Sequence, residues 1–243
     1  MNKNPTATLW LFAYGGITGP THASVISEIL QWSYDGQPIN LDHKVMREDA
    51  LISRSRSKVA SWFLEADRKE AGDVLLMADQ DISWEPGDLA LIARRALEHN
   101  AIVGGIYSKR SFGNGPAVVI DDTGHFQMGE DRLINCKYIA AGFMAIPRAI
   151  IEAVVDAIPR TDEGWSPLFM PYLWDGVYLS EDYAFCQRAS NLGFKVLAST
   201  APILKHEGLY AYRVQDSNIG MPEDRLLALD FGEKVELQPA LRR

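Results

Sequence analysis

The stretch Val74-Leu75-Leu76-Met77-Ala78-Asp79-Gln80-Asp81 decides the predicted fold of this chain. Its first five residues are all apolar, which is typical of a strand buried on both faces of a parallel sheet. Two acids follow where the strand leaves the sheet, and in open α/β sheets the ligand crevice lies at the carboxyl ends of the strands. Because neighbouring carboxylates repel each other, Asp79 and Asp81 predict a site for a hard divalent cation, which commonly bridges phosphate oxygens.

Patterns of strand and helix alternate on both sides of this stretch. Strand patterns occur at residues 8–14, 101–107, 137–146 and 194–198, and helical patterns at 21–32, 53–70, 88–99, from Pro147 onward and at 180–192. A turn at 121–124 joins short strand patterns at 117–120 and 125–128 into a predicted hairpin. Because strands that alternate with helices pair in parallel, we predict an α/β fold in a single domain over residues 1–243. It should hold a mixed, mainly parallel sheet, flanking helices and a small hairpin element.

The composition of the 243 residues narrows the class of protein. A formal net charge of -8 argues against a general basic surface for nucleic acid, although a local basic groove is compatible with it. The chain shows no stretch long enough to span a membrane and no signal-peptide pattern at its start. Cys136 and Cys186 lie far apart, so we expect buried free thiols and a cytoplasmic location.

Three later segments carry further chemistry. They are Ala141-Gly142-Phe143-Met144, Ser180-Glu181-Asp182 at the start of a helix, and Lys205-His206-Glu207-Gly208 after a short strand. Together with the Asp-x-Asp pair, their order and content resemble the GT-A fold glycosyltransferases, in particular the family 2-like enzymes that use sugar nucleotides. The resemblance covers residues 52–208. It implies a GT-A-like domain that moves a sugar from a nucleotide-diphosphate donor to a hydroxyl acceptor.

The resemblance also implies a metal site and a donor site. Asp81 matches the acid that binds Mn²⁺ or Mg²⁺ directly, and Asp79 matches the acid that contacts the ribose or the metal. His206 matches a late histidine that completes the metal shell, and an imidazole ligand favours manganese. Trp84 fits an Asp-x-Asp-x-x-Trp pattern and is expected at the edge of the donor pocket. Residues 1–110 are then the nucleotide-sugar-binding half, residues 111–210 the acceptor and catalytic half, and residues 211–243 a tail.

An arginine segment precedes the acid-bearing strand. In related transferases an Ala-Arg-Asn-like segment lies near the donor, and Ser53-Arg54-Ser55-Arg56 takes its place here. An arginine fork suits a diphosphate, so Arg54 and Arg56 are both donor-binding candidates. Their spacing puts them on different helix faces, and which of them contacts the donor stays open. A solvated helix start would explain either arginine taken alone.

Glu181 and Asp182 resemble the acidic pair from which inverting members draw their catalytic base. A base must reach the acceptor hydroxyl in order to take its proton. Acids in a first helical turn are also favoured by the helix dipole, and Ser180 is a good cap, so a structural role is the competing interpretation. Asp182 lies three and four residues before Phe185 and Cys186, on the inward side of the helix. We therefore rank Asp182 above Glu181 as the base.

The acceptor side is the least defined part of the sequence. Gly142 and Phe143 stand at a strand exit, where a missing side chain would let substrate approach the backbone. The loop expected at 161–179 contains Trp165 and Trp174, whose rings could stack on a sugar or a base. Core packing explains Phe143 equally well, and for at least half of the aromatic residues of the loop it is the stronger interpretation. The donor is expected to be a UDP- or GDP-sugar, and the acceptor a glycan, a lipid-linked glycan or a modified base in DNA.

Other functions fit parts of the same pattern. A nucleotidyltransferase also uses paired acids and a metal on an α/β sheet. A non-catalytic module could bind nucleotide sugars or glycans without turnover, and a glycosyltransferase could act on a hydroxylated base in DNA. Gly15-Gly16-Ile17-Thr18-Gly19 follows the first strand, but its spacing does not match the dinucleotide-binding fingerprint.

Overall fold

The computed structural model describes residues 6–34, 39–47, 49–110, 115–121, 126–208 and 211–214. Its strands are β1 (Thr6–Phe12), β2 (Asn40–Met46), β3 (Val74–Asp79), β4 (Ile82–Ser83), β5 (Ile102–Gly105), β6 (Val118–Ile120), β7 (Leu133–Ile139), β8 (Phe143–Pro147), β9 (Tyr172–Trp174), β10 (Val177–Leu179), β11 (Val196–Ser199) and β12 (Lys205–His206). Its helices are α1 (Gly19–Tyr34), α2 (Ile52–Glu65), α3 (Arg68–Ala71), α4 (Asp88–His99), α5 (Arg148–Asp156) and α6 (Glu181–Asn191).

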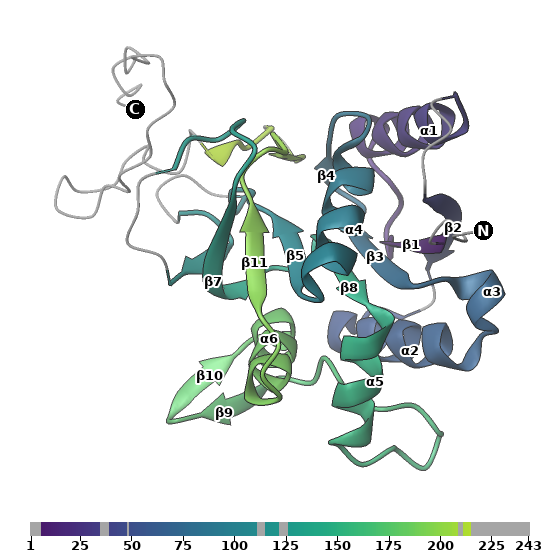
Figure 1. Ribbon diagram of the computed structural model, residues 1–243, viewed down its shortest axis with the longest axis vertical. Helices are drawn as coiled ribbons and strands as arrows, with labels where there is room; N and C mark the ends of the chain where they lie inside the picture. Colours follow the sequence, from purple (N-terminus) through teal and green to yellow (C-terminus); the bar gives the residue numbers. More distant parts are fainter. Residues whose placement is uncertain are drawn as a thin grey trace, which may run out of the picture.

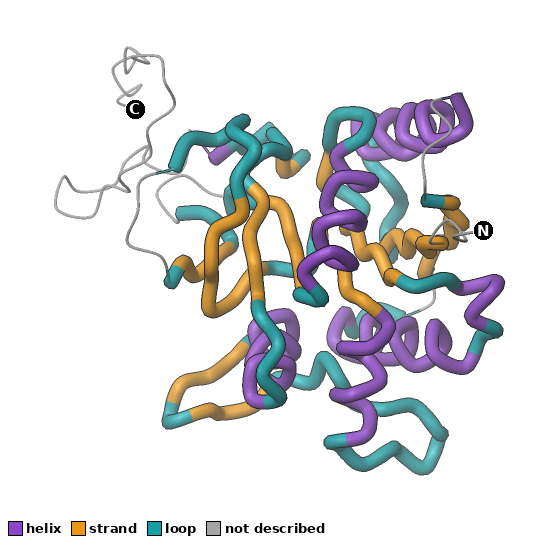
Figure 2. Tube along the Cα trace, in the orientation of Figure 1, coloured by secondary structure: helices purple, strands orange, loops and turns teal. Residues whose placement is uncertain are grey.

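An eight-stranded sheet in the order β2-β1-β3-β8-β5-β11-β7-β6 forms the centre of the molecule (Figure 1). In this sheet β8 and β7 run against the other strands, so the sheet is mixed and mainly parallel. Helices lie on both sides of the strands (Figure 2). The predicted α/β fold class, a mixed and mainly parallel sheet with flanking helices, is therefore confirmed.

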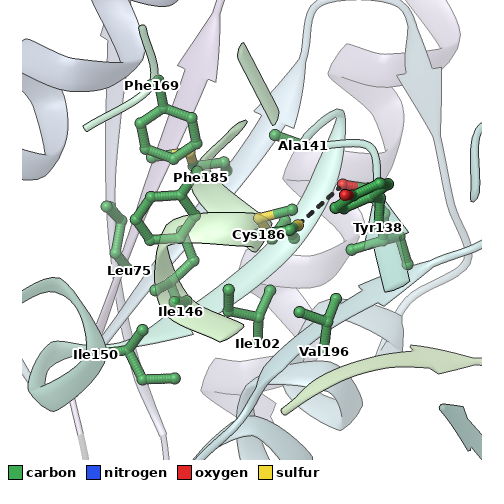
Figure 3. Close-up of a cluster of buried hydrophobic side chains, with 14 of the residues drawn as sticks. Leu75, Ile102, Tyr138, Ala141, Ile146, Ile150, Phe169, Phe185, Cys186 and Val196 are labelled. Carbon is green, nitrogen blue, oxygen red and sulfur yellow. Dashed lines mark hydrogen bonds between the residues drawn. The ribbon is translucent and has the colours of Figure 1, made fainter. Parts of the chain in front are cut away.

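Successive side chains of a strand point in opposite directions, and both faces of β3 are buried. Leu75 and Met77 join an apolar cluster that contains residues of α2, α5 and α6 (Figure 3). Val74, Leu76 and Ala78 join a second cluster, which contains residues of α1 and α4. The uniformly apolar run therefore serves two cores, and its acidic end emerges at one edge of the sheet.

The single strand predicted at 137–146 is wrong. The structure divides this region into β7 and β8, separated by Ala140, Ala141 and Gly142. β7 lies between β11 and β6, whereas β8 lies between β3 and β5. Residues 138–146 are apolar apart from Gly142, so periodicity alone gives no break there, and only Gly142 marks the crossing.

The hairpin predicted from 117–120 and 125–128 is also wrong in its pairing. β6 pairs with β7 in antiparallel fashion, and residues 126–128 form no strand. Phe126 and Met128 instead pack into the first cluster. The predicted turn at 121–124 lies outside the described residues except for Asp121.

A true hairpin occurs inside the region expected to be a loop. β9 and β10 pair across Asp175 and Gly176, which both have positive φ angles of 48° and 77°. An Asp-Gly pair with two positive φ angles is the preferred two-residue hairpin turn, so the sequence did contain this signal. β2 was missed for a different reason: it is an edge strand whose side chains are mostly exposed, and its apolar pattern is weak.

The helix predicted at 53–70 ends earlier, at Glu65. The Asp67 side chain accepts a hydrogen bond from the Lys69 backbone N–H at 2.8 Å and starts the short helix α3. An aspartate that caps a new helix interrupts the one before it. Helix α4 has the predicted bounds, and α6 begins directly after Ser180 as expected.

Two expectations about the chain as a whole can be compared with the structure. Cys136 and Cys186 are buried free thiols, as predicted. Within the described residues, none of the helices has both the length and the apolar character needed to cross a membrane. The division into residues 1–110, 111–210 and 211–243 stays a prediction, and residues 215–243 lie outside the described part.

Candidate functional site

The Asp-x-Asp pair lies at the edge of the sheet where β1 and β3 end. Because β8 is antiparallel to β3, its start lies beside the end of β3, and the Asp79 N–H donates to the Gly142 carbonyl at 3.0 Å. The Gln80 N–H donates to the Phe12 carbonyl at 3.2 Å, and the Gln80 side chain accepts from the Gly15 N–H at 3.2 Å. Gln80 thus fixes the loop after β1 beside the two acids.

A cavity of about 290 Å³ opens at this edge, near the lower end of the range for small-molecule sites. It is lined by the ends of β1, β2 and β3, by the start of α2 and by Arg110. Asp49, Asp79 and Asp81 all contribute to its wall. Tyr14 lies at its rim, with a side chain that is largely exposed.

Arg56 joins the donor-side acid to the catalytic candidates. Its guanidinium donates to Asp79 Oδ1 and to Glu181 Oε1, both at 2.6 Å. The first residues of α6 are therefore tied to the end of β3 by one buried arginine on α2. This arrangement brings together three of the residues that the sequence singled out.

The environment of Arg56 is unusual for an arginine. Arg56 is only 3% exposed, and its Nε atom is buried without a hydrogen-bond partner. Burial alone would lower the pKa of the guanidinium, but the charges of Asp79, Glu181 and Asp182 outweigh it and raise the pKa. Burial and the charges of Asp182 and Asp79 also raise the pKa of Glu181, against the effect of Arg56. The single positive charge of Arg56 therefore interacts with three neighbouring carboxylates.

Gly142 is required at its position by its neighbours. A Cβ atom there would clash with the Tyr107 hydroxyl and would come within 2.9 Å of Asp79 Oδ2. The Gly142 N–H donates to the Tyr107 hydroxyl at 3.1 Å. Burial, followed by the charges of Asp79 and Asp182, raises the pKa of Tyr107 well above its ordinary value. Tyr107 is therefore a neutral hydroxyl held among acids.

Asp81 and His206 come together from distant parts of the chain. β12 pairs with β4, which places His206 Nε2 at 3.6 Å from Asp81 Oδ2. Arg110 approaches the same oxygen, with its Nη1 at 3.0 Å. Burial would raise the pKa of Asp81, but His206 and the charge of Arg110 hold it below the ordinary value. Backbone hydrogen bonds between His206 and Tyr212 hold β12 from its other side.

The donor set at Asp81 fits a divalent metal ion in part. Within the described residues, no group of three or more His, Cys, Asp or Glu side chains is arranged to hold an ion. His206 Nδ1 lies 2.9 Å from the Ser108 carbonyl, which can only accept, so Nδ1 carries a proton and Nε2 is the ring nitrogen that faces Asp81. Metal-binding histidines are typically oriented in this way by a backbone carbonyl. Asp81 and His206 could thus supply two ligands, and Mg²⁺-type sites often complete their shell with phosphates and water.

Asp182 lies close to the network without an ion pair of its own among the contacts described. Its Oδ1 accepts from the Ser180 hydroxyl and from the Tyr183 N–H, the latter at 2.8 Å. Ser180 therefore bonds the acid two residues later rather than capping the helix backbone. The Asp182 residue is 9% exposed, which agrees with the inward direction expected from the sequence. Its charge acts on both Tyr107 and Arg56.

The two arginines of the segment before β3 have different surroundings. Arg54 is exposed and forms two hydrogen bonds to Asp49, at 2.6 and 2.9 Å. That pair holds Asp49 at the cavity wall, and the Arg54 contacts lower the pKa of Asp49. Arg56 contacts the acids directly, as described above. The structure therefore gives the central position to Arg56.

The remaining candidates lie outside this network. Trp84 has a position in the core: its indole N–H donates to Glu28 at 3.2 Å, and its ring packs on Phe143 with centroids 5.4 Å apart. Phe143 is fully buried. Trp165 lies under Lys58, and Trp174 is on the exposed β9–β10 hairpin. The described lining of the 290 Å³ cavity includes none of these four candidate residues.

Four residues of this region were missed by the sequence analysis as site candidates: Tyr14, Asp49, Tyr107 and Arg110. Tyr107 follows β5, a neighbour of β8, so its position after a buried strand was a usable signal. Asp49 precedes α2 and has no motif of its own. Lys109-Arg110 taken alone is typical of a solvated surface, and no local pattern distinguishes the two residues.

Comparison with known proteins gives a likeness of fold. No protein-family model matches the chain, and no curated protein matches its sequence. A197 from STIV superposes with a TM-score of 0.58 at 16% identity, covering 86% of this chain and 91% of that chain. A putative glucose-1-phosphate thymidylyltransferase from Bacillus anthracis, in complex with a sucrose, gives 0.48 at 8% identity, covering 88% and 94%. UTP-bound UGPase from Acinetobacter baumannii gives 0.47 at 9% identity, covering 83% and 88%. The chain thus shares its fold with A197, and this fold is the GT-A-like α/β domain expected from the sequence.

Proposed function

We propose that the protein is a metal-dependent glycosyltransferase that moves a sugar from a UDP- or GDP-sugar to a hydroxyl acceptor. The observation that carries the proposal is the meeting of Asp81 with His206 beside Asp79, at a cavity on the carboxyl edge of the sheet. A carboxylate oxygen and an imidazole nitrogen 3.6 Å apart are a ligand pair that suits a divalent ion such as Mn²⁺. The GT-A-like fold supports the proposal at the level of architecture.

On the donor side, Asp81 and His206 would hold Mn²⁺ or Mg²⁺, and Asp79 would contact the donor ribose or the ion. A divalent ion bound there would neutralise the diphosphate and stabilise the departing nucleotide. Arg56 keeps Asp79 in place through its 2.6 Å hydrogen bond. The wall formed by Tyr14, Asp49 and the end of β1 would take the nucleoside.

On the acceptor side, Asp182 would take the proton of the attacking hydroxyl. The hydrogen bonds from Ser180 and Tyr183 to Oδ1 orient this carboxylate. Glu181, held by Arg56, keeps the start of α6 against the donor site. The acceptor would be a glycan, a lipid-linked glycan or a modified base in DNA, and the buried free thiols suit a cytoplasmic protein.

The test is nucleotide binding to the Asp81→Asn variant, measured by isothermal titration calorimetry with UDP and with GDP. We expect the wild-type protein to bind one of them in the presence of Mn²⁺ and to lose this binding in EDTA. Asp81→Asn should weaken the Mn²⁺-dependent binding at least about 100-fold, since it removes a charged ligand. Asp42→Asn, an exposed acid on β2 paired with Lys44, is the matched control and should bind like the wild type.

Donor affinity that survives both Asp81→Asn and EDTA would refute the metal assignment. A panel of UDP-, GDP- and dTDP-sugars with Mn²⁺ would then identify the donor by slow release of the free nucleotide. Binding without turnover under every acceptor would favour a non-catalytic module.

A further inference from the structure

Arg110 has a position in the candidate site that the proposed chemistry does not yet use. It follows β5 by five residues, and its side chain is 55% exposed. Its Nη1 lies 3.0 Å from Asp81 Oδ2, the same oxygen that faces His206 Nε2. Arg110 also lines the cavity at the end of β3.

The charges of the cavity wall are unbalanced without Arg110. Asp49, Asp79 and Asp81 all line it, whereas Arg110 alone among its described lining residues carries a cationic side chain. Arg54 and Arg56 contribute no wall atoms, and their guanidinium groups are engaged by Asp49 and by the Asp79–Glu181 pair. A nucleoside diphosphate brings several more negative charges. Repulsion would oppose its entry unless cations of the wall turn toward it.

Arg110 and a metal ion cannot both use the Asp81 oxygen. A guanidinium at 3.0 Å and a divalent cation on the same carboxylate oxygen would repel each other strongly. The same short segment also supplies the Ser108 carbonyl that orients His206. An ion held by Asp81 and His206 would free the guanidinium of Arg110 to bind the diphosphate at the same cavity.

We propose that Arg110 exchanges partners: it neutralises Asp81 in the empty site and binds the donor diphosphate once a divalent ion has taken Asp81. The inference rests on the proposed function, because it concerns the same donor site. A guanidinium matches phosphate oxygens with two parallel hydrogen bonds, which suits this second partner. Arg110 is thus a donor-binding residue and also a competitor of the metal.

The experiment compares Arg110→Gln with Lys109→Gln, the neighbouring exposed cation, by titration calorimetry. Mn²⁺ alone should bind Arg110→Gln about three- to tenfold more tightly than the wild type, because its competitor on Asp81 is gone. UDP with saturating Mn²⁺ should bind Arg110→Gln about 10- to 100-fold more weakly, because charge-assisted hydrogen bonds to the phosphates are lost. Lys109→Gln should change neither affinity. Arg110→Lys keeps the charge without the fork and should fall between the wild type and Arg110→Gln for UDP.

The opposite signs make the result specific, since a merely structural role of Arg110 would weaken both affinities together. If Arg110→Gln weakens the affinities for Mn²⁺ and for UDP together, or changes neither of them, the partner exchange is overturned. The proposed function still stands in that case, provided that the wild type binds UDP in a Mn²⁺-dependent way. If the wild type binds neither Mn²⁺ nor UDP, the inference and the proposed function are overturned together. Thermal melting of each variant confirms that the exposed substitutions leave the fold intact.

Discussion

Two acidic centres of this molecule are buried in different ways. Glu28 on α1 is fully buried, and its carboxylate accepts four hydrogen bonds from neutral donors: the indoles of Trp32 and Trp84 and the backbone N–H groups of Gly87 and Ala90, at 2.6 to 3.2 Å. The Asp79–Asp81 centre instead has the charged guanidinium groups of Arg56 and Arg110 as partners, together with the imidazole of His206. It also opens on a cavity, whereas Glu28 contributes to none of the described cavity walls.

The difference separates a structural acid from candidate functional ones. Gly87, which directly precedes helix α4, has a left-handed backbone and no side chain to cap the helix, and Glu28 caps it from α1 instead. Fixed neutral donors satisfy the carboxylate completely and leave it nothing to exchange. Charged partners near a cavity can be replaced by a ligand of the same charge. Changes at Glu28 should therefore affect folding, and changes at the Asp79–Asp81 centre should affect binding and turnover.

The largest effect is expected at Asp182. With a donor and an acceptor found from the panel, Asp182→Asn should lower the turnover number by about 10²- to 10⁴-fold, because the acceptor hydroxyl loses its base. Binding of UDP with Mn²⁺ should stay close to that of the wild type. Steady-state kinetics and calorimetry on the same preparation check both statements. Glu181→Gln provides the comparison, with a smaller loss expected; turnover retained in Asp182→Asn would instead favour a nucleotidyltransferase.

The next largest effect is the loss of stability expected when Arg56 is replaced. Arg56→Ala leaves Asp79 and Glu181 facing each other without a cation. We expect the free energy of unfolding to fall by about 3 kcal/mol, the lower part of the range for breaking a buried pair, because both acids are partly exposed. Urea denaturation at pH 7 measures this loss. Arg56→Lys should recover part of it, and an unchanged urea midpoint in Arg56→Ala would show that the acids do not depend on this arginine.

A smaller loss of stability is expected when the buried carboxylate of Glu28 is replaced. Glu28→Gln keeps the shape of the side chain but replaces one acceptor oxygen by an amide group, which cannot accept from the donors around it. The free energy of unfolding should fall by about 2 kcal/mol. Binding of UDP with Mn²⁺ should not change, which calorimetry would verify. A loss of binding with unchanged stability would reverse the distinction between the two centres.

The smallest effect is a change in pH dependence at Asp88, beside Glu28. Burial, followed by the charges of Glu28 and Glu85 and against a backbone hydrogen bond from Glu85, raises the pKa of Asp88 to about 6 from an ordinary 3.8. Between these values the folded state binds more protons than the unfolded state, so this group lowers the stability as the pH rises from about 4 to 6.

The Asp88→Asn variant should lack that slope. It should match the wild type near pH 4 and exceed it by about 1 kcal/mol at pH 7.5, after allowance for the partial exposure of the carboxylate. Urea denaturation at both pH values provides the measurement. A parallel pH profile in the variant would assign the slope to other groups, such as Glu28, whose pKa burial also raises.

The sequence predicted the strand that positions the site better than it predicted the contacts among the side chains of the site. The apolar run 74–78 determined β3 and the position of its acids, since a strand buried on both faces has few alternatives. The nearness of Asp81 and His206 came from the motif order, and the structure has these side chains at 3.6 Å. Long-range pairing could not be predicted. Nothing local separated β7 from β8, because residues 138–146 form one apolar run interrupted only by Gly142, and the partners of the two strands lie elsewhere in the chain.

The choice between the two arginines could have been made from spacing. Arg56 lies three and seven residues before Val59 and Phe63, which are buried, whereas Arg54 lies on another face of α2. The role of Arg110 had no such signal. Its contact with Asp81 depends on how the segment after β5 crosses the edge of the sheet, which is a property of the tertiary structure.

The central claim is that Asp81 and His206 hold one divalent ion at the donor site. Anomalous diffraction at the manganese edge, from crystals soaked with Mn²⁺ and UDP, tests it most directly. The account predicts a single strong peak between Asp81 Oδ2 and His206 Nε2, with the guanidinium of Arg110 turned away from Asp81. Ordered UDP in the cavity with no manganese peak at this pair, or with the ion bound elsewhere, would contradict it.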